Sequence, residues 1–448
     1  MRNLQVLLSL ILLTSIGTTC LAADNPDMAS ENTELKQRVE KLDKEMAELR
    51  KMVMEQAGET KAQKTTDADL ERIAAKIRKD SEKKAVWSNL DIELYGYLKL
   101  DAAYDTSRIE NGNYAQWVER EDTQDNDDQF NMTANQSRFG VKINGPDDSV
   151  MKASGLAEVD FYGGGSENKS HLMMRHAYIK LDWPEDRFNV IAGQTSDVIS
   201  PLLPSTLNYS VAWWTGNIGY RRPQIRLTKE IGLSTQKDLK LEGAIARTIG
   251  RDDAIAGTES GEDAGIPSLQ GRASVTLPLF GPQKTTMGIS GHVGEEEYDT
   301  LTGEQEFQTW SINLDVTQPI NKWLTIKSEV FKGENLSAYL GGIGQGVIID
   351  TAEANYYKEI GSKGGWIAAS LGPWDKMQFN LGAGIDDVNR RQVNTGDRIM
   401  NRCVFGNLIY SANKHTDIGF ELSNWRTEYY GHGDGDSLRA QAAIIYKF

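Results

Sequence analysis

The sequence of 448 residues lacks the features that mark most enzymes and nucleic-acid-binding proteins. No HExxH, GxSxG or P-loop motif occurs, and the histidines (His171, His176, His292, His415, His432) do not have zinc-ligand spacing. The formal net charge of −15 argues against binding to nucleic acid. We therefore predict no enzyme activity, no cofactor and no metal site.

Long apolar runs are also missing after the N-terminus, so no transmembrane helix is expected. At the N-terminus, Arg2 precedes an apolar run from Leu4 to Leu13, and small residues follow at Ala22 and Ala23. This pattern predicts a secretory signal peptide over residues 1–22. A lipid-modified Cys20 is the alternative, although residues 17–19 lack the usual aliphatic and small pattern. Removal of the peptide leaves Cys403 as the one cysteine, so no intramolecular disulfide can form.

Residues 23–57 contain a heptad pattern that predicts a short coiled coil. The apolar seam consists of Leu35, Val39, Leu42, Met46, Leu49, Val53 and Gln56. Such a seam indicates self-association, although it does not fix the number of helices. A single amphipathic helix lying on the protein is the alternative. Residues 58–90 are predicted to form a polar linker followed by a short basic helix.

From Asp91 the apolar period changes from 3.5 to 2, which is typical of β-strands with one apolar and one polar face. In the first strand, for example, Leu98 and Leu100 alternate with Lys99 and Asp101. About sixteen such runs follow one another up to Phe448. An even number of strands whose ends meet can close into a barrel. We therefore predict an all-β fold for residues 91–448, a 16-stranded antiparallel transmembrane β-barrel, with the short coiled coil in front of it. The strand phase near His176 and Cys403 is ambiguous.

The connections between these runs alternate between short and long. Short turns rich in Pro, Gly and Asx, such as Phe280-Gly281-Pro282, are predicted to face the periplasm. Long polar and mostly acidic loops, such as 106–132 and 336–354, are predicted to face outward. The loop residues Asp125, Asp127 and Asp128, or Asp434 and Asp436, could gather a divalent cation, but solvated acidic loops are favoured. Aromatic residues near strand ends are predicted to form an interfacial girdle, namely Trp183, Trp310, Trp323, Trp366, Trp374 and Tyr446.

Several short segments carry a family resemblance. These are Ser137-Arg138-Phe139-Gly140-Val141-Lys142, Arg175-His176-Ala177-Tyr178, the segment from Gly193 to Asn208, and the terminal Tyr446-Lys447-Phe448. With the coiled coil in front, the chain resembles the DcaP-like porins, trimeric Gram-negative outer-membrane porins with an N-terminal periplasmic coiled coil and a 16-stranded barrel. The resemblance implies a homotrimer in outer-membrane lipid and lipopolysaccharide, recognition of Phe448 by the barrel-assembly machinery, and passage of dicarboxylates and related small anionic solutes. It also implies that residues 195–216 fold into the barrel as a constriction loop.

The alternation places charged residues on the polar, lumen-facing side of the strands. The predicted pore-lining residues are Arg138, Lys142, Glu158, Asp160, Arg222, Arg226 and Arg272, and the predicted constriction loop contains Pro201, Pro204, Trp213 and Trp214. Guanidinium groups facing carboxylates would create a transverse field that orients polar solutes. Arg222 and Arg226 are the best candidates for anion contact, because guanidinium pairs bidentately with carboxylate. The alternative is that they pair with Glu158 or Asp160 and stabilise a polar lumen.

The sequence thus predicts a passive diffusion channel for small hydrophilic solutes. A structural or adhesive outer-membrane protein, tethered to the cell wall by its coiled coil, is the alternative. The basic residues between Arg72 and Lys84 could contact the carboxylates of peptidoglycan. An outer-membrane hydrolase ranks third, because no spacing indicates a Ser/His/Asp constellation.

Overall fold

The computed structural model of the chain describes residues 90–124, 127–145, 150–164, 169–250, 261–300, 303–350 and 356–448. The predicted signal peptide (1–22), coiled coil (23–57) and almost all of the predicted linker (58–90) lie outside the described residues. The chain divides into two compact units, Met1–Ala85 and Val86–Phe448, and the second is described by itself. In the described part, no helix is long and apolar enough to cross a membrane.

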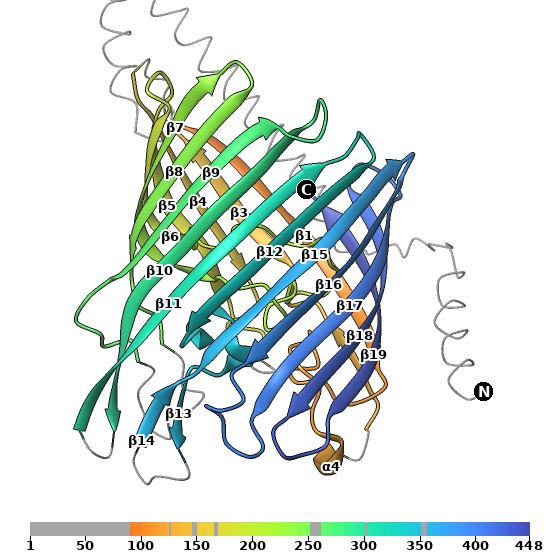
Figure 1. The fold of residues 1–448 in the computed structure, drawn as a ribbon. Coiled ribbons are helices and arrows are strands. Elements are labelled where there is room, and N and C mark those ends of the chain that lie inside the picture. The colour runs from red at the N-terminus through yellow and green to blue at the C-terminus, as the bar shows by residue number, and fades with distance from the viewer. Residues whose placement is uncertain are drawn as a thin grey trace, which may run out of the picture. The chain divides into compact units, whose positions relative to one another are not determined.

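Antiparallel strands make up most of the described chain (Figure 1). The wall strands are β1 (Asp91–Asp105), β2 (Gln129–Thr133), β3 (Arg138–Asn144), β4 (Lys152–Asp160), β5 (Met173–Trp183), β6 (Phe188–Ser196), β7 (Arg221–Ser234), β8 (Lys237–Ala246), β9 (Ser268–Pro278), β10 (Lys284–Thr300), β11 (Gly303–Pro319), β12 (Leu324–Glu334), β15 (Gly361–Trp374), β16 (Met377–Val388), β17 (Arg398–Ser411), β18 (Thr416–Tyr429) and β19 (Gly435–Lys447). The connections contain helix α4 (Glu121–Gln124), the 3₁₀ turns η2 (Ser337–Tyr339) and η3 (Gly342–Gly344), and the hairpin of β13 (Val347–Asp350) and β14 (Tyr356–Glu359).

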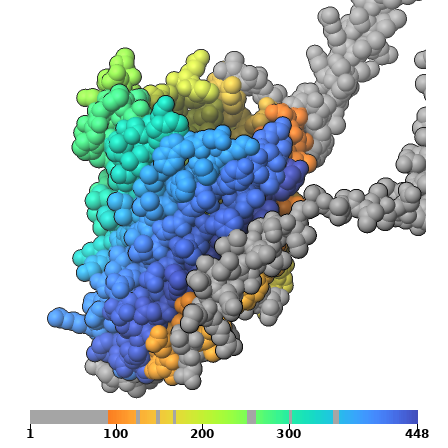
Figure 2. All heavy atoms as spheres, turned by 90° about the vertical axis from the view of Figure 1, so that its right-hand side faces the viewer, coloured from red at the N-terminus to blue at the C-terminus, as the bar shows by residue number. Residues whose placement is uncertain are grey.

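The first and last strands of the sheet pair with each other and close it into a barrel. β19 pairs with β1 from Lys447 opposite Tyr97 to Arg439 opposite Asp105. β2 and β3 both pair with β1, at different heights, and together form one wall strand. The wall therefore has sixteen strands, and the predicted antiparallel barrel is confirmed. In a space-filling view, the C-terminal strands lie side by side as oblique bands on the outer wall (Figure 2).

The two faces of the wall follow the alternation in the sequence. On β18, Glu421, Ser423 and Trp425 are buried, whereas Phe420 and Leu422 are 47% and 57% exposed. A sheet with one face in water would bury its apolar side instead. An apolar outer face with a polar interior is the arrangement of a barrel whose outside is covered by membrane lipid.

Trp366 departs from the predicted interfacial girdle. It lies on β15 next to the outward-facing Ile367, and alternation therefore turns its side chain inward, where it is buried. Its indole nitrogen donates a hydrogen bond to Glu329 Oε2 at 3.0 Å. The assignment of Trp366 to the girdle is therefore wrong, because a lumen carboxylate satisfies the polar edge of the indole instead of a lipid headgroup.

A β-bulge explains the ambiguous phase near His176. Glu158 on β4 lies opposite His176, and Val159 lies opposite Met174, so Arg175 is an extra residue on β5. A bulge of this kind re-aims side chains locally. Both Arg175 and His176 consequently point into the barrel, where Arg175 contacts Glu158 and His176 Nδ1 lies 3.1 Å from Thr195 Oγ1. The ambiguity at Cys403 is resolved too, since its side chain is buried on the inner face.

The long connections leave the barrel end opposite to the short turns, as predicted. We name three of them loop 1 (residues 106–128), loop 3 (197–220) and loop 6 (335–360). Parts of all three turn back into the barrel and pack there as a hydrophobic cluster. Its buried members include Trp117 of loop 1, Trp213 and Trp214 of loop 3, and Ile343 of loop 6. The main apolar core of the described chain therefore lies inside the barrel and is built by loops.

Candidate functional site

Loop 3 crosses the interior of the barrel and contacts wall strands on its far side. Near its start, the backbone N–H of Val198 donates to Gln270 Oε1 on β9 at 2.8 Å. Further along, Leu202 N donates to Glu329 Oε1 on β12 at 2.8 Å. The predicted constriction residues lie on this segment: Pro201 is exposed, and Pro204, Trp213 and Trp214 are buried.

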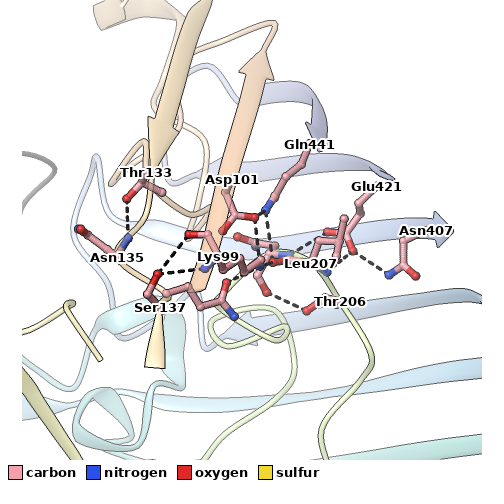
Figure 3. Close-up of polar contacts among 12 residues, drawn as sticks. Lys99, Asp101, Thr133, Asn135, Ser137, Thr206, Leu207, Asn407, Glu421 and Gln441 are labelled. Atoms are coloured by element: carbon pink, nitrogen blue, oxygen red, sulfur yellow. Dashed lines mark hydrogen bonds and ion pairs between the residues drawn. The ribbon is translucent and has the colours of Figure 1, made fainter. Parts of the chain in front are cut away.

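The tip of loop 3 is fixed by a network of polar contacts from four wall strands (Figure 3). Glu421 of β18 accepts hydrogen bonds from the backbone of Leu207 at 2.7 Å and of Asn208 at 3.3 Å. The Leu207 carbonyl accepts from Lys99 Nζ of β1 at 2.8 Å and from Gln441 Nε2 of β19 at 3.3 Å. Asn407 of β17 donates to the Ser205 carbonyl at 2.7 Å. Loop 3 is thus tied to the wall at its tip as well as at its base.

The second half of loop 3 adopts a backbone shape that packing must maintain. Val211, Ala212 and Trp214 have φ values of 46°, 64° and 61°. Non-glycine residues avoid this left-handed region, at a cost of about 1–3 kcal/mol each. Gly216 meets the wall so closely that an added Cβ would lie 2.1 Å from the Gly365 carbonyl oxygen. The strain and the close approach indicate that surrounding contacts dictate the shape of this loop.

Beside loop 3, a group of charged and phenolic side chains gathers on the inner face, which we call the guanidinium cluster. It consists of Arg138, Glu158, Asp160, Arg175, Tyr209 and Arg221. Arg175 Nε donates to Glu158 at 2.7 Å, and its Nη1 donates to Asp160 at 2.7 Å. Arg138 Nε lies 3.4 Å from Glu158 Oε1. Three guanidinium groups therefore face two carboxylates, which leaves an excess of one positive charge.

Tyr209 brings loop 3 into the guanidinium cluster. Its hydroxyl donates to Asp160 Oδ2 at 3.3 Å and accepts a hydrogen bond from Arg221 Nη2 at 3.5 Å. Burial raises the pKa of Tyr209 above its ordinary value, so the phenol remains a neutral donor. The Arg221 guanidinium also lies over the rings of Tyr220 and Trp213, at 4.9 and 5.8 Å. The cluster thus combines positive charge with aromatic faces, and Arg138 is the most exposed of its three guanidinium groups.

The structure brings together three of the predicted pore-lining residues, Arg138, Glu158 and Asp160. Sequence reasoning missed Arg175, Tyr209 and Arg221. The bulge hides Arg175 from a strict period of two, although the segment around it was recognised as a motif. Lys142 lies on the same strand as Arg138 and is 43% exposed, with its Nζ 3.0 Å from Glu93 Oε1.

Arg222 lies apart from the guanidinium cluster and is 1% exposed. Its Nε lies 2.7 Å from Asp197 Oδ1 at the base of loop 3. Its Nη2 donates to the Ala338 carbonyl of loop 6 at 3.1 Å, and the guanidinium stacks 3.8 Å above the ring of Tyr339. In this arrangement Arg222 joins loop 3 to loop 6, and contact with a solute would require it to leave Asp197.

Arg226 and Arg272 are also engaged by protein groups. Arg226 donates to Gln224 Oε1 at 3.0 and 2.9 Å and to the Ser196 carbonyl. Arg272 forms a bidentate pair with Asp315 at 3.0 and 2.7 Å, and a further bond of 3.1 Å to Glu242. These contacts link adjacent regions of the wall, as expected for a polar barrel interior.

Three carboxylates on other wall strands, β12, β16 and β18, anchor the inward loops, and we call them the anchoring carboxylates. They are Glu329, Asp386 and Glu421, and all three are buried. Glu329 and Glu421 accept from the loop 3 backbone, and Asp386 accepts from Ile343 N of loop 6 at 3.3 Å. Loops cover these three carboxylates and withdraw them from solvent, whereas Arg138 remains 23% exposed.

No metal-binding group is found in the described ranges, where three or more His, Cys, Asp or Glu side chains nowhere gather suitably for an ion. His292 is buried between Ser311, at 2.8 Å, and Thr309, at 3.0 Å, and it stacks on Tyr339. Its contacts are those of a packed interior side chain.

The closed sixteen-stranded wall, the apolar outer face and an inward-folded third loop define this molecule as an outer-membrane barrel of the porin class. The sequence matches the DcaP outer membrane protein family over residues 21–248, and the chain belongs to that family. This is a family of channel proteins and not a family of enzymes. A search of curated protein sequences finds no significant match.

Solved structures support the same fold. The outer membrane channel DcaP of Acinetobacter baumannii is similar with a TM-score of 0.65 and 19% identity, over 81% of this chain and 98% of that one. OmpF of Salmonella typhi, in a complex with daunomycin, gives a TM-score of 0.52 and 10% identity over 81% and 99%. An anion-selective porin from Comamonas acidovorans gives 0.50 and 12% over 80% and 100%. At these identities the likeness concerns the fold.

Proposed function

We propose that the chain forms a passive diffusion channel for small hydrophilic solutes, with a preference for organic anions such as dicarboxylates. The observation that carries this proposal is the guanidinium cluster, where three guanidinium groups and two carboxylates flank loop 3. Elsewhere in the interior, the anchoring carboxylates are covered by loops. An anion passing loop 3 would therefore meet the less compensated positive charge.

The proposed solute contacts are Arg138 and, further along the wall, Lys142, while the more buried Arg175 and Arg221 add their positive charge at the same place. A carboxylate of the solute can exchange with those of Glu158 and Asp160 because guanidinium groups offer several donors in one plane. The excess positive charge lowers the energy of anions and raises that of cations at this point. Arg222 and Arg272 instead keep the loops and the wall in place, and Pro201, Pro204, Trp213 and Trp214 stiffen the constriction.

A planar bilayer recording tests the proposal. Folded, purified protein should give conductance steps, and a potassium chloride gradient should give a reversal potential of the sign for anion preference. Succinate should reduce the chloride current. The double variant Arg138→Gln, Arg221→Gln should lose both effects, whereas the matched double variant Arg187→Gln, Lys322→Gln, with both changes in periplasmic turns, should keep them. Cation preference of the wild type would refute the anion assignment.

Self-association and cell-wall contact belong to the same proposal. The heptads of residues 23–57 support self-association, and the family resemblance supports a homotrimer, which would give conductance steps in groups of three. The basic residues between Arg72 and Lys84 are proposed to contact peptidoglycan. Unchanged co-sedimentation with cell walls after removal of residues 24–90 would refute that contact. Absence of any conductance from folded protein would favour the structural or adhesive alternative.

Phe448 is proposed as the signal that the barrel-assembly machinery reads. Its ring is exposed on the outer face and lies 5.9 Å from that of Phe139. Replacement by Ser should therefore lower the amount of assembled barrel in cells while leaving refolding in detergent possible.

A further inference from the structure

The outer face of the barrel carries a groove over four consecutive strands, β12, β15, β16 and β17. Its volume is about 1000 Å³. Exposed apolar side chains form its sides, namely Val330, Ile367, Ile385 and Val404. The groove exists because Gly365 stands between Val330 and Ile385 in the register, and Ala383 stands between Ile367 and Val404. These two small residues thus open a hollow in an otherwise continuous apolar belt.

The external end of this groove carries positive charge. Lys332, Lys363 and Arg402 are exposed on the outer face at the level where the apolar belt ends. A second hollow of about 440 Å³ adjoins the groove at Lys363 and Asp387, and it is lined further by Lys332, Arg390 and Arg391. Cations therefore surround the point where the apolar groove meets the external surface.

The arrangement of these cations is unfavourable without an anion. Lys332 and Lys363 are directly opposite each other on neighbouring strands. Like charges in that position destabilise a sheet. Asp387 offers partial compensation, since its Oδ2 lies 3.4 Å from Lys363 Nζ. Among the residues that the structure describes, we find no carboxylate paired with the side chains of Lys332 or Arg402.

We propose that this surface binds one phosphorylated, acylated lipid of the outer leaflet. Its acyl chains lie in the groove along Gly365 and Ala383, and its phosphate groups lie between Lys332, Lys363 and Arg402. The charges fit this occupant because phosphate is the anion present at the external edge of the apolar belt, and clustered Lys and Arg at that depth attract anionic headgroups. The C-terminal strands that carry the site form the oblique bands of the wall in Figure 2.

A second outer groove provides an internal comparison. It lies over β9, β10 and β11, has a volume of about 470 Å³, and is also opened by glycines, Gly271 and Gly291. The charged residues in its lining, Arg272 and His292, point into the barrel and are buried. This groove offers apolar surface without a cationic rim, so it should accept acyl chains without selecting phosphate.

Native mass spectrometry of the full chain in non-ionic detergent, titrated with bisphosphorylated lipid A, tests the proposal. We expect one tightly bound lipid A per protomer, and weaker binding of the same lipid without its phosphates. The triple variant Lys332→Gln, Lys363→Gln, Arg402→Gln should weaken lipid A binding by about 100-fold, because each such cation contributes roughly a factor of five. Lys376→Gln, a change of a periplasmic-turn cation on the same wall, should leave binding unchanged.

The variant Ala383→Trp fills the groove and should abolish tight binding while channel conductance, which reports folding, is retained. Equal binding of lipid A by the triple variant and the wild type would overturn the proposal. A second result would also overturn it: Ala383→Trp changes the number of subunits in the assembly but leaves lipid A binding unaltered. A second copy of the chain would then be the occupant of the groove. Equal binding of the phosphate-free lipid to the wild type would show that the cations play no part.

Discussion

Replacement of Glu421 by Ala is expected to release the tip of loop 3 from the barrel wall. Glu421 is buried and accepts hydrogen bonds from Leu207 N, Asn208 N and Asn407 Nδ2, at 2.7, 3.3 and 2.9 Å. Asn407 keeps another acceptor in the variant, the Ser205 carbonyl. The two backbone donors lose the acceptor that Glu421 provides.

The size of the effect follows from these two donors. A buried donor left without an acceptor costs about 1–3 kcal/mol, so the docked tip should lose at least about 2 kcal/mol. Since about 1.4 kcal/mol corresponds to a factor of ten, the population of the undocked tip should rise by at least about 30-fold.

Hydrogen exchange measured by mass spectrometry on detergent-folded protein reports this population. Amides of residues 205–209 should exchange at least about 30-fold faster in Glu421→Ala than in the wild type, because their protection depends on local opening. Asp417→Ala is the matched control. Asp417 lies on the same strand and the same face, but its partners are Ser411 and Lys447 rather than loop 3.

Equal exchange of these amides in the two variants would refute the reasoning. The contacts from Lys99 and Gln441 to the Leu207 carbonyl would then be sufficient to hold the tip. Faster exchange throughout the barrel in Glu421→Ala would also contradict it, because the effect would be a general loss of stability.

Three further predictions concern other charged groups. Arg138→Gln makes the guanidinium cluster neutral. One charge at about 6 Å in a water-like medium is worth roughly 0.7 kcal/mol before salt screening and about 0.4 kcal/mol at about 0.1 M salt, and it favours anions and disfavours cations by that amount each. Reversal potentials should therefore show an anion-to-cation permeability ratio lower by about 4-fold, and an unchanged ratio would exclude Arg138 from the solute path. Glu110 in loop 1 has its pKa raised to about 7 by desolvation and by its hydrogen bond with Glu119. Because the raised pKa favours the protonated folded form, protection of the loop 1 amides from exchange should fall between about pH 4.5 and 7 as pH rises, and Glu110→Gln should remove this dependence. Arg222→Gln leaves Asp197 buried without its cation at a cost of about 3–5 kcal/mol, and thermal melting should show reduced stability; unchanged melting would mean that water replaces the guanidinium.

The barrel wall could be predicted from the sequence because its signal is local. Each strand, such as the run around Lys99 and Asp101, shows its two faces within a few residues, and the short turns mark one end of the barrel. The inward position of Arg138, Glu158 and Asp160 followed from the same period. Where a bulge adds one residue, as at Arg175, the local period fails and the side chain is assigned to the wrong face or to none.

The interior could not be predicted to the same extent, because contacts between loops that are far apart in the chain determine where its side chains lie. Arg222 contacts Asp197 of loop 3 and Tyr339 of loop 6, which are far apart in the chain. The positions of these residues in the sequence do not indicate that they meet. Trp366 shows the same limitation, since whether an aromatic residue near a strand end faces lipid or a lumen carboxylate depends on register alone. Loops 1 and 6 were predicted as external and polar, whereas Trp117 and Ile343 pack inside the barrel.

The pairing of β1 with β19 makes the wall a closed ring of hydrogen-bonded strands. Gly96 and Phe448 exchange backbone hydrogen bonds of 3.2 and 3.1 Å, so the seam joins segments that lie far apart in the chain. β1 and β19 therefore each keep one open edge until they meet, while the outer face beside them is already apolar. Open strand edges recruit other strands. Closure of this one seam thus protects the whole wall from pairing with other chains.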